Sequence, residues 1–61
     1  MELWQEQLKN MFTLPNGDAA IEAFDDTKKI VALSPEAHAE IARNIEAVLQ
    51  SSGINYEVKQ L

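Results

Sequence analysis

The absence of cysteine from a chain of only 61 residues is the feature that most constrains how it can fold. A chain of about 60 residues buries roughly 60% of the surface that its unfolded form exposes, so its core supplies only about 3–5 kcal/mol of stability. Without cysteine, neither a disulfide nor a thiolate zinc site can add to that core. We therefore expect a single small domain over residues 1–61, with association between chains as the extra source of stability.

The other side chains that carry chemistry do not form a recognisable catalytic or metal-binding motif. His38 is the single histidine, and no nucleophile motif accompanies it. Asp18, Glu22, Asp25 and Asp26 crowd one segment, but their spacing is not that of a calcium-binding loop. We therefore expect no catalytic residue, no metal ligand and no cofactor, and we interpret the chain as a non-enzymatic protein.

The apolar segments are too short to cross a membrane. The longest apolar run covers residues 30–33, whereas a membrane-spanning helix needs roughly 20 residues. The first residues lack the basic and apolar regions of a secretion signal. We expect a cytoplasmic protein with no membrane segment.

Two amphipathic helices are predicted. Over residues 2–12 the apolar side chains recur with helical spacing at Trp4, Leu8, Met11 and Phe12. The second helix is predicted over residues 35–51, because Ser34 can cap its free amides and Pro35 suits the first helical position. Gly53 is a suitable left-handed terminator.

Three segments are predicted as strands. Residues 29–33 form a compact β-branched run, and residues 19–24 are compatible with helix or strand. Since a loop over residues 25–28 can join the two as a hairpin, context favours a strand for the earlier segment. In residues 54–61 the apolar side chains of Ile54, Tyr56 and Val58 alternate with polar ones, which is typical of a half-buried strand.

This order of elements, α-β-β-α-β, predicts an α+β fold: a three-stranded mixed sheet with both helices on one face. We favour the sheet order 1-2-3, because residues 30–33 make the most apolar strand and hence the best central one. The alternative is the order 2-1-3, in which all neighbouring strands are antiparallel.

The charge is unevenly distributed along the chain. The whole protein has a formal net charge of −5, from ten acidic and five basic residues. Residues 1–27 contain six acidic residues and one lysine, so they carry all of that charge, whereas residues 28–61 contain four of each sign. If the first helix and the first strand are neighbours, one side of the protein is acidic and attracts a basic partner. The same charge disfavours nucleic acid and membrane surfaces as partners.

These observations favour a small protein-interaction module that docks onto a partner protein and forms a homodimer. The first helix carries more apolar bulk than its length requires, and the terminal strand, residues 54–61, has a sheet edge that no following element covers. The predicted partner-binding residues are Trp4, Met11, Asp25, Asp26, Tyr56 and Val58.

The alternative is a nucleic-acid-related regulator. The strand and helix of residues 29–49 resemble half of a ribbon-helix-helix repressor, and this resemblance implies a strand that reads the major groove of DNA. The sequence departs from that family after Gly53, where a strand stands in place of a second helix. An acidic inhibitor that blocks a DNA-binding protein belongs to the same alternative class.

Overall fold

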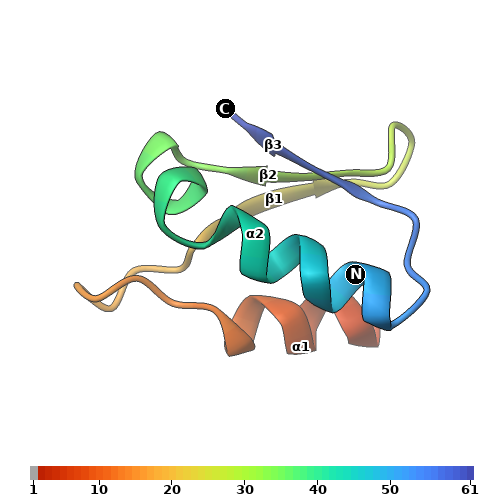
Figure 1. Cartoon of the computed structure of the whole chain (residues 1–61), viewed down its shortest axis with the longest axis horizontal. Helices are drawn as coiled ribbons and strands as arrows, with labels where there is room; N and C mark the ends of the chain where they lie inside the picture. The colour runs from red at the N-terminus through yellow and green to blue at the C-terminus, as the bar shows by residue number, and fades with distance from the viewer. Residues whose placement is uncertain (1) are drawn as a thin grey trace.

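Two helices cover one face of a three-stranded sheet (Figure 1). The computed structural model describes residues 2–61. Along the chain the elements are α1 (Leu3–Met11), β1 (Ile21–Asp25), β2 (Ile30–Leu33), α2 (Pro35–Ser51) and β3 (Glu57–Gln60). The predicted α+β fold and its order of elements are confirmed.

The strand order is β1-β2-β3, with β2 in the centre. β1 and β2 form an antiparallel hairpin, whereas β2 and β3 are parallel because α2 carries the chain back across the sheet between them. Val31 of β2 pairs with Phe24 on one side and with Val58 on the other. The favoured order 1-2-3 is therefore confirmed, and the alternative order 2-1-3 is wrong.

Local side-chain and backbone chemistry determines where α2 begins and ends. The Ser34 hydroxyl oxygen accepts a hydrogen bond from the Ala37 amide at 3.3 Å, and Pro35 follows in the first turn. At the other end Gly53 has a φ of 70°, which lets the Ile54 amide donate to the Leu49 carbonyl oxygen at 2.9 Å. The predicted helix over residues 35–51 is confirmed at both ends.

The hairpin loop is shifted by one residue from its predicted position. Asp25 belongs to β1, and its carboxylate accepts hydrogen bonds from the amides of Thr27 and Lys28 at 3.1 and 2.9 Å. Lys29 has a φ of 59°, so it lies in the loop and β2 begins at Ile30. The predicted strand start at residue 29 was wrong, because a left-handed residue cannot continue the extended backbone.

β3 is shorter than the predicted strand over residues 54–61. Ile54 to Tyr56 carry the chain from the end of α2 up to the sheet, and pairing with β2 begins at Glu57. The alternation of apolar residues nevertheless correctly indicates burial, since Val58 is buried and Ile54 and Tyr56 are half-buried.

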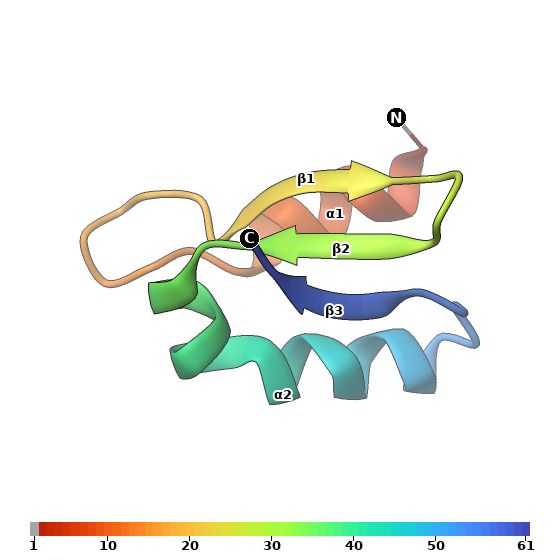
Figure 2. The ribbon, with the colours of Figure 1, turned by 90° about the horizontal axis from the view of Figure 1, so that it is seen from above.

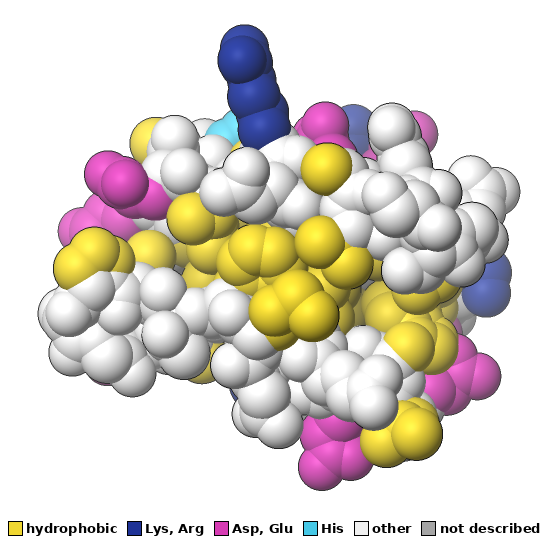
Figure 3. All heavy atoms as spheres, turned by 60° about the horizontal axis from the view of Figure 1, so that its bottom comes forward, with side chains coloured by type: hydrophobic (Ala, Val, Ile, Leu, Met, Phe, Trp, Pro, Cys, Tyr) yellow, Lys and Arg dark blue, Asp and Glu magenta, His cyan; other side chains and the backbone are white. Residues whose placement is uncertain are grey.

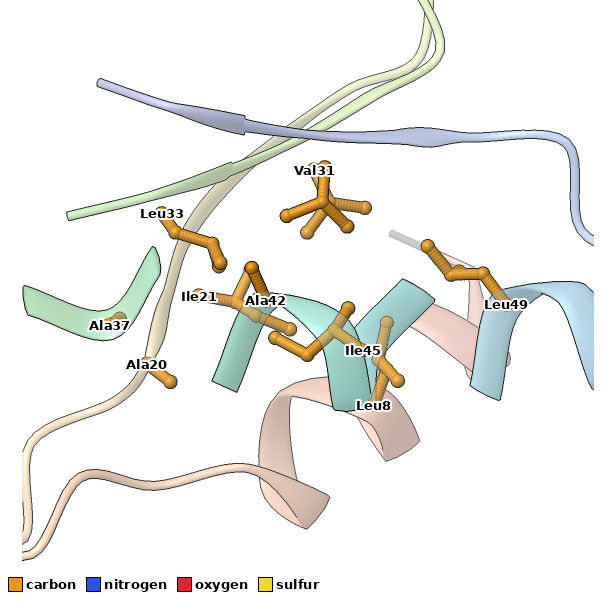
Figure 4. Close-up of a cluster of buried hydrophobic side chains, with 10 residues drawn as sticks. Leu8, Ala20, Ile21, Val31, Leu33, Ala37, Ala42, Ile45 and Leu49 are labelled. Atoms are coloured by element: carbon orange, nitrogen blue, oxygen red, sulfur yellow. The ribbon is translucent and has the colours of Figure 1, made fainter. Parts of the chain in front are cut away.

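The core lies between the sheet and the helices (Figure 4). The sheet contributes Ile21, Val31, Leu33 and Val58, and α2 contributes Ile45 and Leu49, all of them buried. α1 adds Leu8. A β-bulge at Glu22 separates the pairs Ile21–Leu33 and Ala23–Ala32, so both Ile21 and Phe24 face the helices.

Candidate interaction surfaces

Three of the six predicted partner-binding residues, Trp4, Asp26 and Tyr56, come together at the end of the sheet that carries the hairpin loop. The Trp4 ring lies edge-on to Phe24 and Tyr56, with ring centroids 5.6 and 4.9 Å apart. This T-shaped arrangement is the favoured geometry for aromatic pairs. Since Trp4 is on α1, Phe24 on β1 and Tyr56 just before β3, the cluster fastens α1 to the sheet.

A hydrogen-bond network continues this cluster to the hairpin loop. One carboxylate oxygen of Asp26 accepts from the Tyr56 hydroxyl at 2.7 Å and from the Gln5 side-chain amide at 2.6 Å. The side-chain carbonyl oxygen of Gln5 in turn accepts from the Glu2 backbone amide at 3.0 Å. The network therefore joins the first turn of α1, the hairpin loop and the approach to β3.

This network shifts the pKa values of Tyr56 and Asp26 in opposite directions. The hydrogen bond to Asp26, together with desolvation, raises the pKa of Tyr56 from 10.0 to about 12, because the carboxylate stabilises the neutral phenol. The hydrogen bonds from Tyr56 and Gln5 lower the pKa of the Asp26 carboxyl below 3.8. The ammonium group of Lys29 lies 5.4 Å from the Tyr56 ring centroid, within the range of a cation–π contact.

Gln5 is the residue of this network that sequence reasoning missed. Its exposed fraction is only 1%, although glutamine on a short surface helix is usually solvated. The one local signal is its position three residues after the helix cap at Glu2, where a glutamine can hydrogen-bond back to the cap amide. Nothing in the sequence indicates its contact with Asp26, 21 residues away.

The other three predicted partner-binding residues are placed apart from this cluster. Val58 is buried in the core, and Asp25 holds the hairpin loop through the two hydrogen bonds described above. Met11 is 60% exposed at the end of α1. A role in partner binding remains a prediction for all six residues.

An apolar face lies between α1 and the second half of α2. A shallow hollow of about 90 Å³ is lined by Trp4, Gln7, Leu8, Met11, Val48, Ser52 and Ile54, none of which is charged. We call this set of residues the apolar face. Figure 3 shows the helical side of the molecule, where hydrophobic side chains gather across the middle and charged ones lie at the rim.

A second hollow, of about 250 Å³, lies between α1 and β1. Its lining includes Gln5 and Lys9 from α1, Glu22 and Phe24 from β1, and Asp26 from the loop. Figure 2 shows β1 as the outermost strand on this side, with α1 beneath it. α1 and β1 are therefore neighbours at this hollow, where Glu22 and Asp26 lie together with Lys9. That one side of the protein is acidic stays a prediction.

Neither Glu22 nor Asp26 forms an ion pair within the part of the chain that the structure describes. Among residues 2–61 the only ion pair joins Lys59 to Glu57, with 3.4 Å between nitrogen and oxygen. Glu22 is exposed at the β-bulge, and Asp26 is exposed in the loop. Asp26 also accepts the hydrogen bonds from Gln5 and Tyr56, and the positive charge of Lys29 helps to lower the pKa of its carboxyl.

The hydrogen-bond pattern leaves backbone groups of β1 without a partner. The amides of Glu57 and Leu61 donate to the carbonyl oxygens of Lys29 and Leu33, so the odd-numbered residues of β2 bond to β3. The even-numbered residues of β2 then face β1, where their partners are Ala23 and Asp25. The N–H and C=O of Phe24 consequently point away from the sheet.

The outer edge of β3 has a different environment. By the same pattern the backbone groups of Val58 and Gln60 point outward, but α2 runs alongside this edge (Figure 2). A third hollow lies between this edge and α2, and its lining includes Glu46 and Gln50 of α2 and Val58 of β3. The edge of β3 that the sequence led us to expect as uncovered is therefore flanked by a helix.

His38 is half-buried on α2, and within the described part of the chain no three His, Asp or Glu side chains are grouped closely enough to hold a metal ion. No helix among residues 2–61 has the length and apolar character needed to span a bilayer. Comparisons with protein-family models, with curated protein sequences and with solved structures found no match.

Proposed function

We propose that this chain is a protein-interaction module that binds an extended, basic segment of a partner protein along the outer edge of β1. The observation that carries the proposal is the combination, at one edge, of outward-pointing backbone groups and two exposed carboxylates, those of Glu22 and Asp26. An exposed strand edge can accept an additional strand through main-chain hydrogen bonds, and the adjoining side chains then select which segment binds.

The backbone of Phe24 supplies the main-chain part of this interaction. Its N–H and C=O point outward together, so a strand lying beside β1 can both accept from and donate to the same residue. The bulge at Glu22 shortens the regular part of the edge. We therefore expect a short segment with modest affinity, whose specificity depends on side chains.

The carboxylates of Glu22 and Asp26 determine the charge of that segment. Both line the hollow below the edge, Glu22 at the bulge and Asp26 in the hairpin loop. Lysine or arginine side chains on the partner segment can pair with these two carboxylates. Lys9 lines the α1 side of the hollow, so we place the basic groups of the partner on the strand side. The net charge of this region also speeds the encounter with a basic protein.

A peptide-binding experiment tests the proposal. The probe is a short capped peptide in which lysine and valine alternate, titrated into the ¹⁵N-labelled protein. We expect the amide resonances of Glu22, Phe24 and neighbouring residues to shift, and binding to weaken as NaCl rises from about 50 mM to about 500 mM. A peptide with glutamate in place of lysine should not bind.

Two matched controls separate strand pairing from general charge attraction. Glu22→Gln should weaken binding about two- to five-fold, as for an exposed ion pair, while Glu40→Gln, the same change on α2, should leave it unchanged. Methylating alternate backbone nitrogens of the peptide should abolish binding. Equal binding of the methylated peptide, equal effects of the two substitutions, or tighter binding of a DNA duplex than of the peptide would overturn the proposal.

A further inference from the structure

We infer that the Asp26 carboxylate is the docking point for a basic side chain of the bound segment, and that Gln5 is the positioning residue that holds this carboxylate in place. This inference rests on the proposed function, because it assigns roles within the same binding site. Two observations carry it: the burial of Gln5, and the unequal surroundings of the two oxygens of Asp26.

The side-chain amide of Gln5 is held at both of its polar atoms. Its oxygen accepts from the Glu2 backbone amide at 3.0 Å, and its nitrogen donates to Asp26 Oδ1 at 2.6 Å. A reversed amide would place donor against donor and acceptor against acceptor, so only one orientation satisfies both partners. Gln5 is 1% exposed, and its bond to Glu2 belongs to the N-terminal cap of α1, so the helix fixes the direction in which Gln5 donates.

The two oxygens of the Asp26 carboxylate have different surroundings. Oδ1 accepts from Gln5 at 2.6 Å and from the Tyr56 hydroxyl at 2.7 Å, short distances that suit an ionised acceptor. Within the described part of the chain no group donates to Oδ2. Lys29, whose ammonium group lies over the Tyr56 ring, forms no ion pair with Asp26 there. Since a carboxylate has about four acceptor sites, Oδ2 can still bind a cationic group of the partner.

An ordered carboxylate binds a partner better than a mobile one. Asp26 is exposed in the hairpin loop, where an unbonded side chain would exchange between rotamers. Its two hydrogen bonds order it before the partner arrives, so less conformational entropy is lost on binding. The Glu22 side chain lines the same hollow but accepts no hydrogen bond within residues 2–61. Of the two carboxylates, that of Asp26 is therefore the one already held in position.

Titration of variants with the lysine–valine peptide tests these roles. Gln5→Met keeps an unbranched side chain and removes both hydrogen bonds, so it should weaken binding about two- to ten-fold, the range expected when one further side chain must be ordered. Tyr56→Phe removes the other bond to Oδ1 and should act in the same direction, which keeps the test valid if loss of the cap bond unfolds Gln5→Met. Gln7→Met, the same change at an exposed position of α1, should leave binding unchanged.

Two readouts separate positioning from general support of the fold. In a double-mutant cycle, Gln5→Met should have no further effect in an Asp26→Asn chain but should keep its full effect in a Glu22→Gln chain, because only the former lacks the carboxylate that Gln5 positions. In the absence of peptide, three-bond couplings to the Asp26 β-protons should indicate one χ1 rotamer in the wild type and averaging between rotamers in Gln5→Met.

The possible failures are distinguishable. A wild-type chain that does not bind the peptide would overturn the proposed function and this inference with it. If the wild type binds, equal affinities of Gln5→Met and Gln7→Met, or an equal effect of Gln5→Met in the Asp26→Asn and Glu22→Gln chains, would overturn this inference alone. Averaging of the Asp26 rotamer in the wild type would do the same.

Discussion

Truncation of Ile45 should remove most of the stability of the fold. Ile45 is fully buried and lies in the middle of the core, with Leu8 on the α1 side and Val31 on the sheet side (Figure 4). Replacing a buried isoleucine by alanine costs about 2–5 kcal/mol, because the transfer free energy of the removed groups is lost and a cavity remains. A core of this size supplies only about 3–5 kcal/mol, so Ile45→Ala should remove most of the free energy of unfolding.

The smaller change Ile45→Val should lower the free energy of unfolding by an amount that can be measured while the protein stays folded. It removes one methylene group and should cost about 0.5–1.5 kcal/mol. With a urea dependence of about 1 kcal/mol per molar, the unfolding midpoint should fall by roughly 0.5–1.5 M. Leu3→Ala is the matched control, since it truncates an aliphatic side chain of the same size that is 69% exposed. That change should alter stability by no more than about 0.5 kcal/mol.

Urea titrations followed by both circular dichroism and Trp4 fluorescence measure these differences. Trp4 contacts Phe24 and Tyr56 across the interface between α1 and the sheet, so its emission reports the loss of tertiary structure. The measurements belong at low protein concentration, where self-association does not add to stability. If the urea midpoint of Ile45→Ala falls no further than that of the Leu3→Ala control, the burial of Ile45 does not contribute to stability as argued here.

Three further changes test the caps and the tyrosine network. Ser34→Ala should lower the unfolding free energy by about 1 kcal/mol, because the Ala37 amide loses its acceptor. Ser34→Asp keeps a side-chain acceptor at this position and should retain most of the wild-type stability. Thermal denaturation of the two variants measures the difference between them. Gly53→Ala should destabilise the protein by about 1 kcal/mol, because φ is 70° at this position; the space around it is open, so the cost comes from the backbone and not from a clash. Gly53→Asn should cost less, because asparagine tolerates the left-handed conformation. Equal urea midpoints for the two variants would contradict the left-handed cap. The hydrogen bond to Asp26 raises the pKa of Tyr56 to about 12, so the stability it contributes is fully present below about pH 10 and is lost as the pH rises to about 12. Tyr56→Phe should therefore be less stable than the wild type near neutral pH and should approach it at alkaline pH, and a stability difference that stays constant over this range would exclude the network as its cause.

Much of the fold could be predicted because its signals are local. The start of α2 depends on adjacent residues, Ser34 and Pro35, and its end on Gly53, so a short window of sequence contains the whole argument. The hairpin between β1 and β2 is also local, although its exact loop depended on the left-handed conformation of Lys29. A lysine gives no signal for that conformation, since the backbone adopts it to close the turn.

The candidate surfaces were only partly predictable, because they depend on which elements become neighbours. The pattern of charges placed the acidic residues on α1 and β1, and the structure confirms that these two elements adjoin. The bulge at Glu22 and the outward direction of the Phe24 backbone follow from hydrogen bonds across the whole sheet. The flanking of β3 by α2 depends on helix packing, which the alternation of residues 54–61 does not report.

The sequence by itself therefore determined the number of helices and strands, their order along the chain and the ends of α2, since capping residues and apolar periodicity act over a few neighbouring positions. The exact bounds of β2 and β3 and the order of strands in the sheet depended on the tertiary structure. Only the tertiary structure decided that Gln5, Asp26 and Tyr56 share one network, with partners 21 and 30 residues apart. It also decided that Met11 stays exposed while Leu8 is buried on the same helix. The physical reason is that a side chain's burial and hydrogen-bond partners depend on how the layers pack, whereas the conformation of the backbone depends largely on adjacent residues.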